Sequence, residues 1–171
     1  MRISLSGPAG AGKTTLFEEL KKLLAKEDYS FYPEIARTLI NLEPDIFSDK
    51  KEFEERLFNI HKTREHEGFK LQNAVFDRCI WDCFVYSDYY GFLLDKNEAE
   101  ETLNSCIDVI FVFPQVSRPA DEKLMNLYLK HSEIIQSAGQ AVYFPQFFNL
   151  EPKIDFIMDV IKSAPVNCNY I

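Results

Sequence analysis

The 171-residue sequence lacks the cysteine and histidine patterns that bind zinc. Its four cysteines form no C-x-x-C pair, and none of its three histidines lies near them at zinc-ligand spacing. Two of them, Cys79 and Cys83, fall on one helix face, where core packing is favoured over metal binding. We expect all four to be reduced and mostly buried thiols of a cytoplasmic protein. They are Cys79, Cys83, Cys106 and Cys168.

Long apolar runs and an excess of positive charge are also missing. No stretch approaches the eighteen apolar residues of a membrane span, and a strand expected from residue 2 leaves no room for a leader. The net charge of -8 and the isoelectric point near 4.9 argue against broad binding of nucleic acid, although a local basic cleft stays open. With 46% hydrophobic residues and a mean hydropathy of -0.21, residues 1–171 suit a single soluble domain.

What the sequence does have is the stretch GPAGAGKTT, from Gly7 to Thr15. It matches the phosphate-loop pattern G-x-x-x-x-G-K-[ST], which is informative only between a strand and a helix. A β-type run, Arg2 to Ser6, precedes the loop, and an amphipathic helical pattern follows it. Apolar residues recur there at Leu16, Phe17, Leu20, Leu23 and Leu24. The alternative, a glycine turn with a surface lysine, does not explain this context.

The chemistry of such a loop predicts bound ATP and Mg²⁺. Glycines allow successive N–H groups to surround a phosphate, and a helix N-terminus adds unpaired N–H groups and a positive dipole end. Lys13 is placed to reach the β and γ phosphates, and the Thr14 hydroxyl to bind Mg²⁺. The predicted nucleotide-binding residues are Gly7, Gly10, Ala11, Gly12, Lys13, Thr14 and Thr15.

Strand and helix patterns alternate along the remaining chain, with no repeat or linker. Strands are expected at Ser30 to Pro33, Ala74 to Asp77, Asp108 to Phe113 and Ala141 to Phe144. Helices are expected at Glu34 to Asn41, Lys50 to Lys70, Ile80 to Leu94, Asn97 to Cys106, Asp121 to Gln136 and Lys153 to Ser163. This alternation predicts an α/β protein with the three-layer P-loop NTPase fold, a central parallel sheet flanked by helices.

Ligands of such sheets bind beyond the carboxyl ends of the strands, so polar residues at those ends are candidates. Glu34 follows the second strand, with Arg37 one helical turn later, and is either a general base toward an acceptor or a helix-stabilising acid. Asp77 ends the third strand and is a candidate Mg²⁺ ligand, with Arg78 facing the acceptor. The alternative for this pair is a helix cap beside a surface arginine.

Arg118 follows the fourth strand in a polar segment before a helix. A mobile arginine there would stabilise the charge of a transferred phosphoryl group, and the alternative is an ordinary loop residue. The predicted catalytic residues are therefore Lys13, Glu34, Arg78 and Arg118, and the predicted metal ligands are Thr14 and Asp77.

Together, the loop from Gly7 to Thr15, the YPE ending at Glu34 and the pair Asp77 and Arg78 resemble P-loop kinases of nucleosides and nucleotides. Deoxynucleoside kinases and thymidylate kinases have an acid after strand two and an acid-Arg pair after strand three. The stretches EIAR and FDRCIWD are also similar to ribosylnicotinamide kinase domains of bacterial NAD regulators and to small P-loop ATPase-like proteins. The resemblance implies ATP and Mg²⁺ at Lys13 and Thr14, and an acceptor near Glu34 and Arg78. The segment around Arg118 departs from it, since many nucleotide kinases carry more arginines there.

Composition sets two further helices apart. The helix after Arg78 holds many aromatic residues, which favours core packing, and Trp81 is its best candidate for a base-stacking pocket. The charged helix from Lys50 to His66 is expected to be a solvated cover of the acceptor site, with a homodimer contact as the alternative. We expect all three histidines, His61, His66 and His131, to be surface residues.

Two functions are consistent with these residues and motifs. The first is an ATP-dependent phosphotransferase that acts on a nucleoside, a nucleotide or a similar small molecule. The second is an NTP-hydrolysing or NTP-sensing protein that acts on a partner. The chain has no N-K-x-D guanine motif and is too short for the helical domain of large ATPase machines, which favours the kinase. Phosphorylation of a hydroxyl within nucleic acid is a variant that the acidic composition disfavours.

Overall fold

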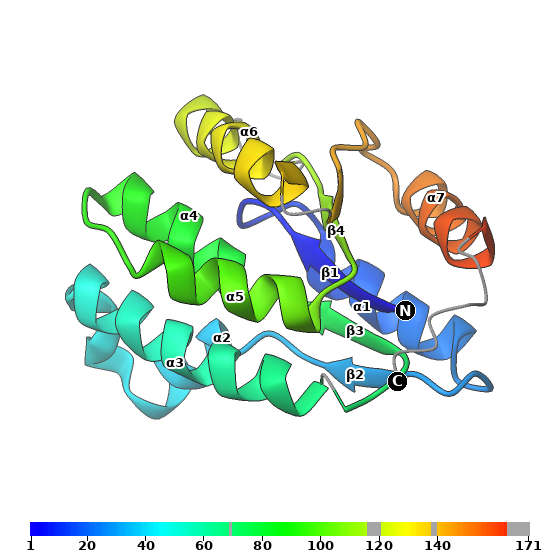
Figure 1. Ribbon diagram of the computed structural model, residues 1–171, viewed down its shortest axis with the longest axis horizontal. Helices are drawn as coiled ribbons and strands as arrows, with labels where there is room; N and C mark the ends of the chain where they lie inside the picture. Colours follow the sequence, from blue (N-terminus) through cyan, green and yellow to red (C-terminus); the bar gives the residue numbers. More distant parts are fainter. Residues whose placement is uncertain (69, 116–120, 138–139, 164–171) are drawn as a thin grey trace.

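The structure is a computed structural model that describes residues 1–68, 70–115, 121–137 and 140–163 (Figure 1). Within these residues the chain forms one five-stranded sheet in the order β2-β3-β1-β4-β5, and every pairing is parallel. The strands are β1 (Arg2–Ser6), β2 (Ser30–Tyr32), β3 (Ala74–Asp77), β4 (Val109–Val112) and β5 (Ala141–Tyr143). The predicted α/β fold with a central parallel sheet is therefore confirmed.

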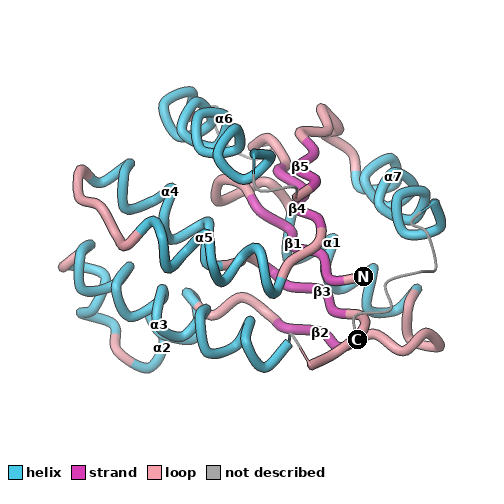
Figure 2. The backbone as a smooth tube through the Cα atoms, viewed as in Figure 1, coloured by secondary structure: helices cyan, strands magenta, loops and turns pink. Residues whose placement is uncertain are grey.

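Helices connect the strands, as a parallel sheet requires (Figure 2). They are α1 (Lys13–Leu23), α2 (Ala36–Leu42), the 3-10 helix η1 (Pro44–Ser48), α3 (Lys50–Gly68), α4 (Ile80–Tyr90), α5 (Lys96–Cys106), α6 (Glu122–Ser137) and α7 (Leu150–Ser163). None of the helices in the described ranges is both long and apolar enough to cross a membrane.

Alternation along the strands divides the core between the two faces of the sheet. Ile3 and Leu5 of β1 point to a cluster formed with α1 and α7, while Phe76 and Ile110 point to a larger cluster formed with the helices α2 to α6. The ribbon shows α1 and α7 on one side of the sheet and α3 to α6 on the other (Figure 1). Burial on both faces explains why β4 is entirely apolar and why β3 is apolar up to Asp77.

Several helix boundaries differ by one to four residues from the sequence-based expectation, among them those of α2, α4 and α7. Helix α4 ends at Tyr90 because Gly91 adopts a left-handed conformation with φ of 89°, which stops the helix before Leu94. Helix α2 begins at Ala36, so Glu34 lies in the connection after β2 and not within the helix. Helix α7 begins at Leu150, three residues before the expected start, with Pro152 tolerated in its first turn.

The register of the strands brings the candidate residues to one edge of the sheet. Leu5 pairs with Asp77 and Ser6 with Val112, so β1, β3 and β4 end side by side. Tyr32 pairs with Phe76, which places the residues after β2 beside those after β3. The residues that follow these strands therefore come together at the carboxyl end of β1.

Candidate active site

The glycine loop joins β1 to α1 at the centre of this edge. Gly7, Gly10 and Gly12 have φ angles of 122°, 84° and 79°, a region in which a residue with a Cβ is strained. A Cβ on Gly7 would lie 2.5 Å from the carbonyl oxygen of Phe113, so this position requires glycine. Gly12 precedes α1 and offers no side-chain cap. The first N–H groups of α1 are therefore directed at an anion site.

Lys13, the first residue of α1, folds back over the loop. Its Nζ donates hydrogen bonds of 2.8 Å to the carbonyl oxygens of both Gly7 and Pro8, and its side chain is buried. Burial, followed by the charge of Arg78, lowers the pKa of Lys13 from 10.5 to about 7. The lysine is thus positioned inside the loop, where an anion that enters would favour its charged form.

Thr14 and Asp77 meet beside the loop, as the sequence predicted for two ligands of one metal. The Thr14 hydroxyl donates to Oδ2 of Asp77 at 3.0 Å. The other oxygen, Oδ1, is buried without a hydrogen-bond partner in the described residues, and burial raises the pKa of Asp77. A hydroxyl beside an unpartnered carboxylate oxygen fits Mg²⁺, which binds oxygen ligands and takes phosphates and water for the rest.

Glu34 and Arg78, from the ends of β2 and β3, also lie together. Nε of Arg78 donates to Oε1 of Glu34 at 3.1 Å, and Nη1 donates to the carbonyl oxygen of Gly7 at 3.1 Å. Both side chains are largely shielded, with exposed fractions of 17% for Glu34 and 11% for Arg78. Arg37 approaches the second oxygen of Glu34 at 3.6 Å but is 70% exposed. Arg78 thus contacts the phosphate loop directly, and Glu34 lies against Arg78.

Helix α3 braces these two strand ends, a role that its sequence did not reveal. Arg64 donates to the carbonyl oxygens of Pro33, at 2.9 Å, and of Arg78, at 2.6 Å. Arg78 has a φ of 70°, unusual for a residue with a side chain, and the hydrogen bond from Arg64 helps to hold it there. Glu65 accepts the backbone N–H of Ile80 at 2.8 Å. The expectation that α3 is mainly solvated is wrong for the face that carries these residues.

Two of the three histidines are likewise buried, contrary to the prediction. His61 is 1% exposed and lies against Arg64, 2.8 Å from its Nη2, and burial followed by the charge of Arg64 lowers the pKa of His61. His131 is 5% exposed, and its Nε2 lies 2.8 Å from a carboxylate oxygen of Asp88. His66 is exposed, as expected. The buried rings find polar partners that the sequence spacing alone does not reveal.

Glu54 is a third buried charged residue of α3, with an exposed fraction of 4%. Burial raises the pKa of its carboxyl group to about 8, against a weaker opposing effect of Arg78, and the Cys83 thiol is a hydrogen-bond partner. An acid whose pKa is higher in the folded state binds more protons there than in the unfolded chain. Between pH 4.5 and about 8, Glu54 therefore makes the fold less stable as the pH rises.

Replacing Glu54 with glutamine should remove this cost. We expect Glu54→Gln to raise the free energy of unfolding at pH 8 by on the order of 3 kcal/mol, and the gain to shrink toward pH 5. Urea unfolding at both pH values measures it, with Glu55→Gln on the exposed side of α3 as the control. A Glu54→Gln protein that is no more stable than wild type at pH 8 would contradict the raised pKa of Glu54.

Asp82, in the first turn of α4, is the buried acid at the centre of the site. Its Oδ1 accepts hydrogen bonds from the Gly7 N–H at 3.3 Å, the Tyr128 hydroxyl at 2.7 Å and Arg78 at 3.3 Å. Its Oδ2 accepts from the Ser6 hydroxyl at 2.7 Å and from the Cys79 N–H at 3.0 Å. Asp82 was not among the residues predicted from the sequence, although its place in the first turn of the expected helix, four residues after Arg78, was a usable signal.

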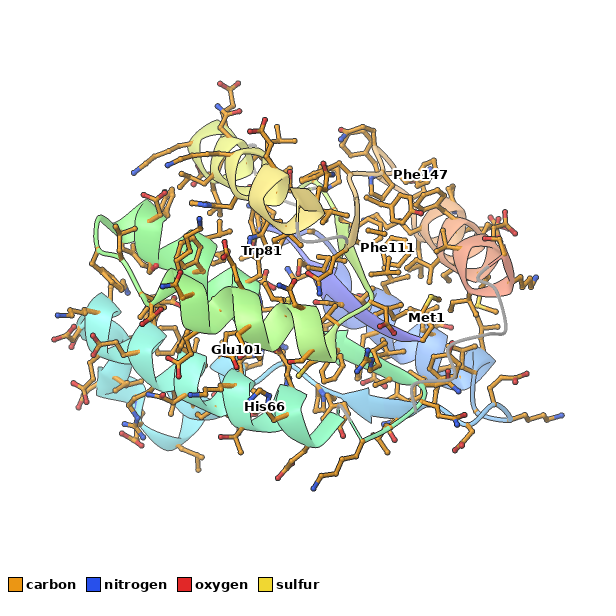
Figure 3. All side chains as sticks on the ribbon, in the orientation of Figure 1. Met1, His66, Trp81, Glu101, Phe111 and Phe147 are labelled. Atoms are coloured by element: carbon orange, nitrogen blue, oxygen red, sulfur yellow. The ribbon has the colours of Figure 1, made fainter. Side chains whose placement is uncertain are left out.

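Two aromatic residues of α4, Trp81 and Phe84, are buried in the core, as expected, whereas Tyr86, Tyr89 and Tyr90 are half-buried. Trp81, labelled in Figure 3, is 2% exposed. It contacts Tyr128 of α6 edge to face, with the ring centroids 5.3 Å apart. It borders a cavity of about 10 Å³, lined also by residues of α5 and α6 and not by the glycine loop. Trp81 is therefore not placed to stack on an acceptor. Tyr86 is closer to the site, with Arg78 5.5 Å from its ring centroid.

Side chains from outside the loop support its outer turns. Gln115 donates to the carbonyl oxygen of Ala9, and the buried Lys153 of α7 donates to that of Ala11, both at 2.8 Å. Neither contact was predicted from the sequence. Arg118, the fourth predicted catalytic residue, lies outside the described residues, as does Cys168. Cys79, Cys83 and Cys106 are buried free thiols, as predicted.

Comparison with known families gives the class of this fold and site. A family described as AAA domain matches residues 2–124, well over half of the chain, and the chain belongs to this family. Its P-loop implies that the chain binds a nucleotide. No curated protein matches the sequence.

Several solved structures that match this fold are kinases. A deoxyadenosine kinase from M. mycoides has a TM-score of 0.65 and 17% identity, over 96% of this chain and 100% of that one. A thymidylate kinase from Ehrlichia chaffeensis has a TM-score of 0.63 and 16% identity, over 94% of this chain and 98% of that one. A shikimate kinase from Acinetobacter baumannii, in complex with shikimate, has a TM-score of 0.61 and 16% identity, over 97% of this chain and 95% of that one. At such identities the likeness concerns the fold, which resembles that of P-loop kinases.

Proposed function

We propose that the protein is an ATP-dependent phosphotransferase of the cytoplasm that moves the γ-phosphoryl group to a nucleoside, a nucleotide or a similar small molecule. The observation that carries this proposal is the position of Glu34 and Arg78 beside the phosphate loop, with Arg78 3.1 Å from the Gly7 carbonyl oxygen. The pair supplies a base and a cation where an acceptor hydroxyl would enter.

The remaining residues divide the work of phosphoryl transfer. The loop N–H groups and Lys13 bind the phosphates, while Thr14 and Asp77 hold Mg²⁺, which would neutralise the charge that develops on the phosphoryl group. Glu34 accepts the proton of the attacking hydroxyl, and Arg78 orients the acceptor or the γ-phosphoryl group. Arg118 stays a predicted contributor to charge stabilisation.

The buried amine of Lys13 makes ATP binding depend on pH. Because the pKa of Lys13 is about 7 in the free protein and a bound triphosphate favours the protonated form, binding above pH 7 should take up a proton. We expect the Kd for ATP to rise about tenfold per pH unit between pH 7 and 9. Calorimetry in two buffers of different ionisation enthalpy measures the uptake. Lys13→Arg, which stays charged, should lose the pH dependence, and a dependence retained in that variant would assign it to another group.

The test of the proposed function is ADP release from Mg-ATP, alone and with a panel of acceptors. The panel contains nucleosides, nucleoside monophosphates, nicotinamide riboside and single-stranded oligonucleotides. Stimulation by a small molecule with a phosphorylated product would support the kinase, and stimulation by an oligonucleotide alone would favour a hydroxyl within nucleic acid. A rate that no acceptor changes would contradict the proposal.

The second candidate is an NTPase or nucleotide sensor that acts on a partner, and membership of an AAA domain family favours it. Under this candidate, Glu34 would orient a water molecule instead of an acceptor hydroxyl. ATP hydrolysis stimulated by a partner protein, without any phosphorylated small molecule, would distinguish it.

A further inference from the structure

Asp82 lies where the phosphate loop, the end of β3 and helix α6 meet, and the proposed reaction uses it nowhere. It is 2% exposed, so its charge is balanced by the protein and not by water. Its two oxygens accept five hydrogen bonds, at 2.7 to 3.3 Å, from Ser6, Gly7, Arg78, Cys79 and Tyr128. A cap for α4 alone would need only the Cys79 N–H.

Two of these contacts concern the groups that would meet the phosphates. The hydrogen bond from the Gly7 N–H to Asp82 fixes the first turn of the loop. The carbonyl oxygen of Gly7 in turn accepts hydrogen bonds from both Lys13 and Arg78. The ion pair between Asp82 and Arg78 holds the guanidinium close to the loop. The ion pair with Glu34 attracts the same guanidinium toward the end of β2. The position of Arg78 thus depends on two acids, one on the acceptor side and one beneath the loop.

We propose that Asp82 is a positioning residue whose negative charge holds Arg78 against the phosphate loop and balances the two cations that converge there. The contact with Tyr128 extends this arrangement to α6. Part of this inference rests on the proposed kinase function, because Arg78 is assigned to the transferred group or the acceptor. The part that concerns Lys13 and the loop does not depend on phosphoryl transfer.

The charge of Asp82 has an effect that a structural contact would not have. Arg78 lies between two acids, with its Nε 3.1 Å from Glu34 and its Nη1 3.3 Å from Asp82, and Nη1 also donates to the carbonyl oxygen of Gly7. Without the charge of Asp82, Glu34 is the remaining acid on the guanidinium, which should move away from the loop. Binding of a nucleotide phosphate at the loop should then weaken.

The decisive comparison is between Asp82→Asn and Tyr128→Phe. Both variants disturb the contact between α4 and α6, but only Asp82→Asn removes the charge. We expect Asp82→Asn to weaken ADP binding about tenfold and, with an acceptor identified, to lower kcat/KM about tenfold to a hundredfold. Tyr128→Phe should keep an ADP affinity and a kcat/KM within about threefold of wild type, although its thermal stability falls.

Binding of ADP, measured without turnover, separates this inference from the proposed function. A weaker ADP affinity in Asp82→Asn but not in Tyr128→Phe supports the positioning role whether or not a phosphorylated product is found. Equal ADP affinities in Asp82→Asn, Tyr128→Phe and wild type would overturn it and leave Asp82 as a contact between helices. If Asp82→Asn does not fold, Asp82→Glu keeps the charge and is expected to keep the ADP affinity within about threefold of wild type while lowering kcat/KM. A Glu variant with a tenfold weaker ADP affinity or an unchanged kcat/KM would equally overturn the inference.

Discussion

Lys13→Ala is expected to abolish measurable turnover, with a loss of at least about 10²-fold in kcat, and to leave the fold intact. The variant removes the cation that would contact the β and γ phosphates, and a charge that acts on the transferred group accounts for a loss of this size. The fold should persist because burying Lys13 is itself costly, as its lowered pKa indicates. Steady-state turnover and a thermal unfolding curve measure the two effects.

The control for Lys13→Ala is Lys22→Ala, on the exposed face of the same helix. Lys22 is 69% exposed and pairs with Glu19 one turn away, a kind of contact that contributes little to stability. Its replacement should leave kcat unchanged. Normal turnover in Lys13→Ala would remove the glycine loop from the reaction, and an unfolded Lys13→Ala protein would show that the lysine is needed for the fold.

The second large effect is expected from Glu34→Gln, which should lower the rate of phosphoryl transfer by roughly 10² to 10⁴-fold without weakening ATP binding. Glutamine keeps the shape of the side chain but cannot accept the proton of an attacking hydroxyl. Single-turnover measurements at saturating ATP give the rate, and ATP titration gives the affinity. The loss should therefore appear in kcat and not in the Kd for ATP.

Glu43→Gln is a matched control for this variant. Glu43 also pairs with an arginine, Arg56, at 2.5 and 2.6 Å, but both side chains are exposed and lie outside the site. Comparing the two variants separates the loss of a base from the loss of an ion pair. If Glu34→Gln reacts as fast as wild type, Glu34 is only an acid that holds Arg78 at the helix entry.

Local patterns were enough to predict the centre of the sheet. The bounds of β1 and β3 agree with the sequence-based prediction to the residue, because each strand is an apolar or alternating run that ends at a polar or glycine residue. The meeting of Thr14 with Asp77 also followed from placing an acid at the end of the strand beside the glycine loop. Here one short motif and one strand end carry all the required information.

The buried polar side of α3 could not be predicted in this way. Arg64 and Glu65 are charged residues within a charged helix, and the sequence pattern is the same for a solvated face. Their partners are backbone groups of Pro33, Arg78 and Ile80, which reach them only after the sheet has formed. Burial of a charge depends on such distant partners, and a local pattern does not contain them.

The role of Asp82 could be predicted only in part. Its spacing from Arg78 was visible in the sequence, and so was its place in the first turn of a helix. The contacts with Ser6, Gly7 and Tyr128, which give it a role beyond capping, join segments up to 76 residues apart along the chain. The carboxylate was thus detectable as a cap, but its connection to the phosphate loop required the fold.

Transfer of the γ-phosphoryl group of ATP to a small molecule held near Glu34 and Arg78 can be followed directly. The measurement traces the label of γ-labelled ATP in a single turnover with the acceptor panel, for wild type and Glu34→Gln. We expect the label to appear in an organic phosphate in the wild type, only with one class of acceptor, and far more slowly in the variant. Label that appears only as inorganic phosphate, at the same rate with and without every acceptor, would show that the protein is not a kinase of these molecules.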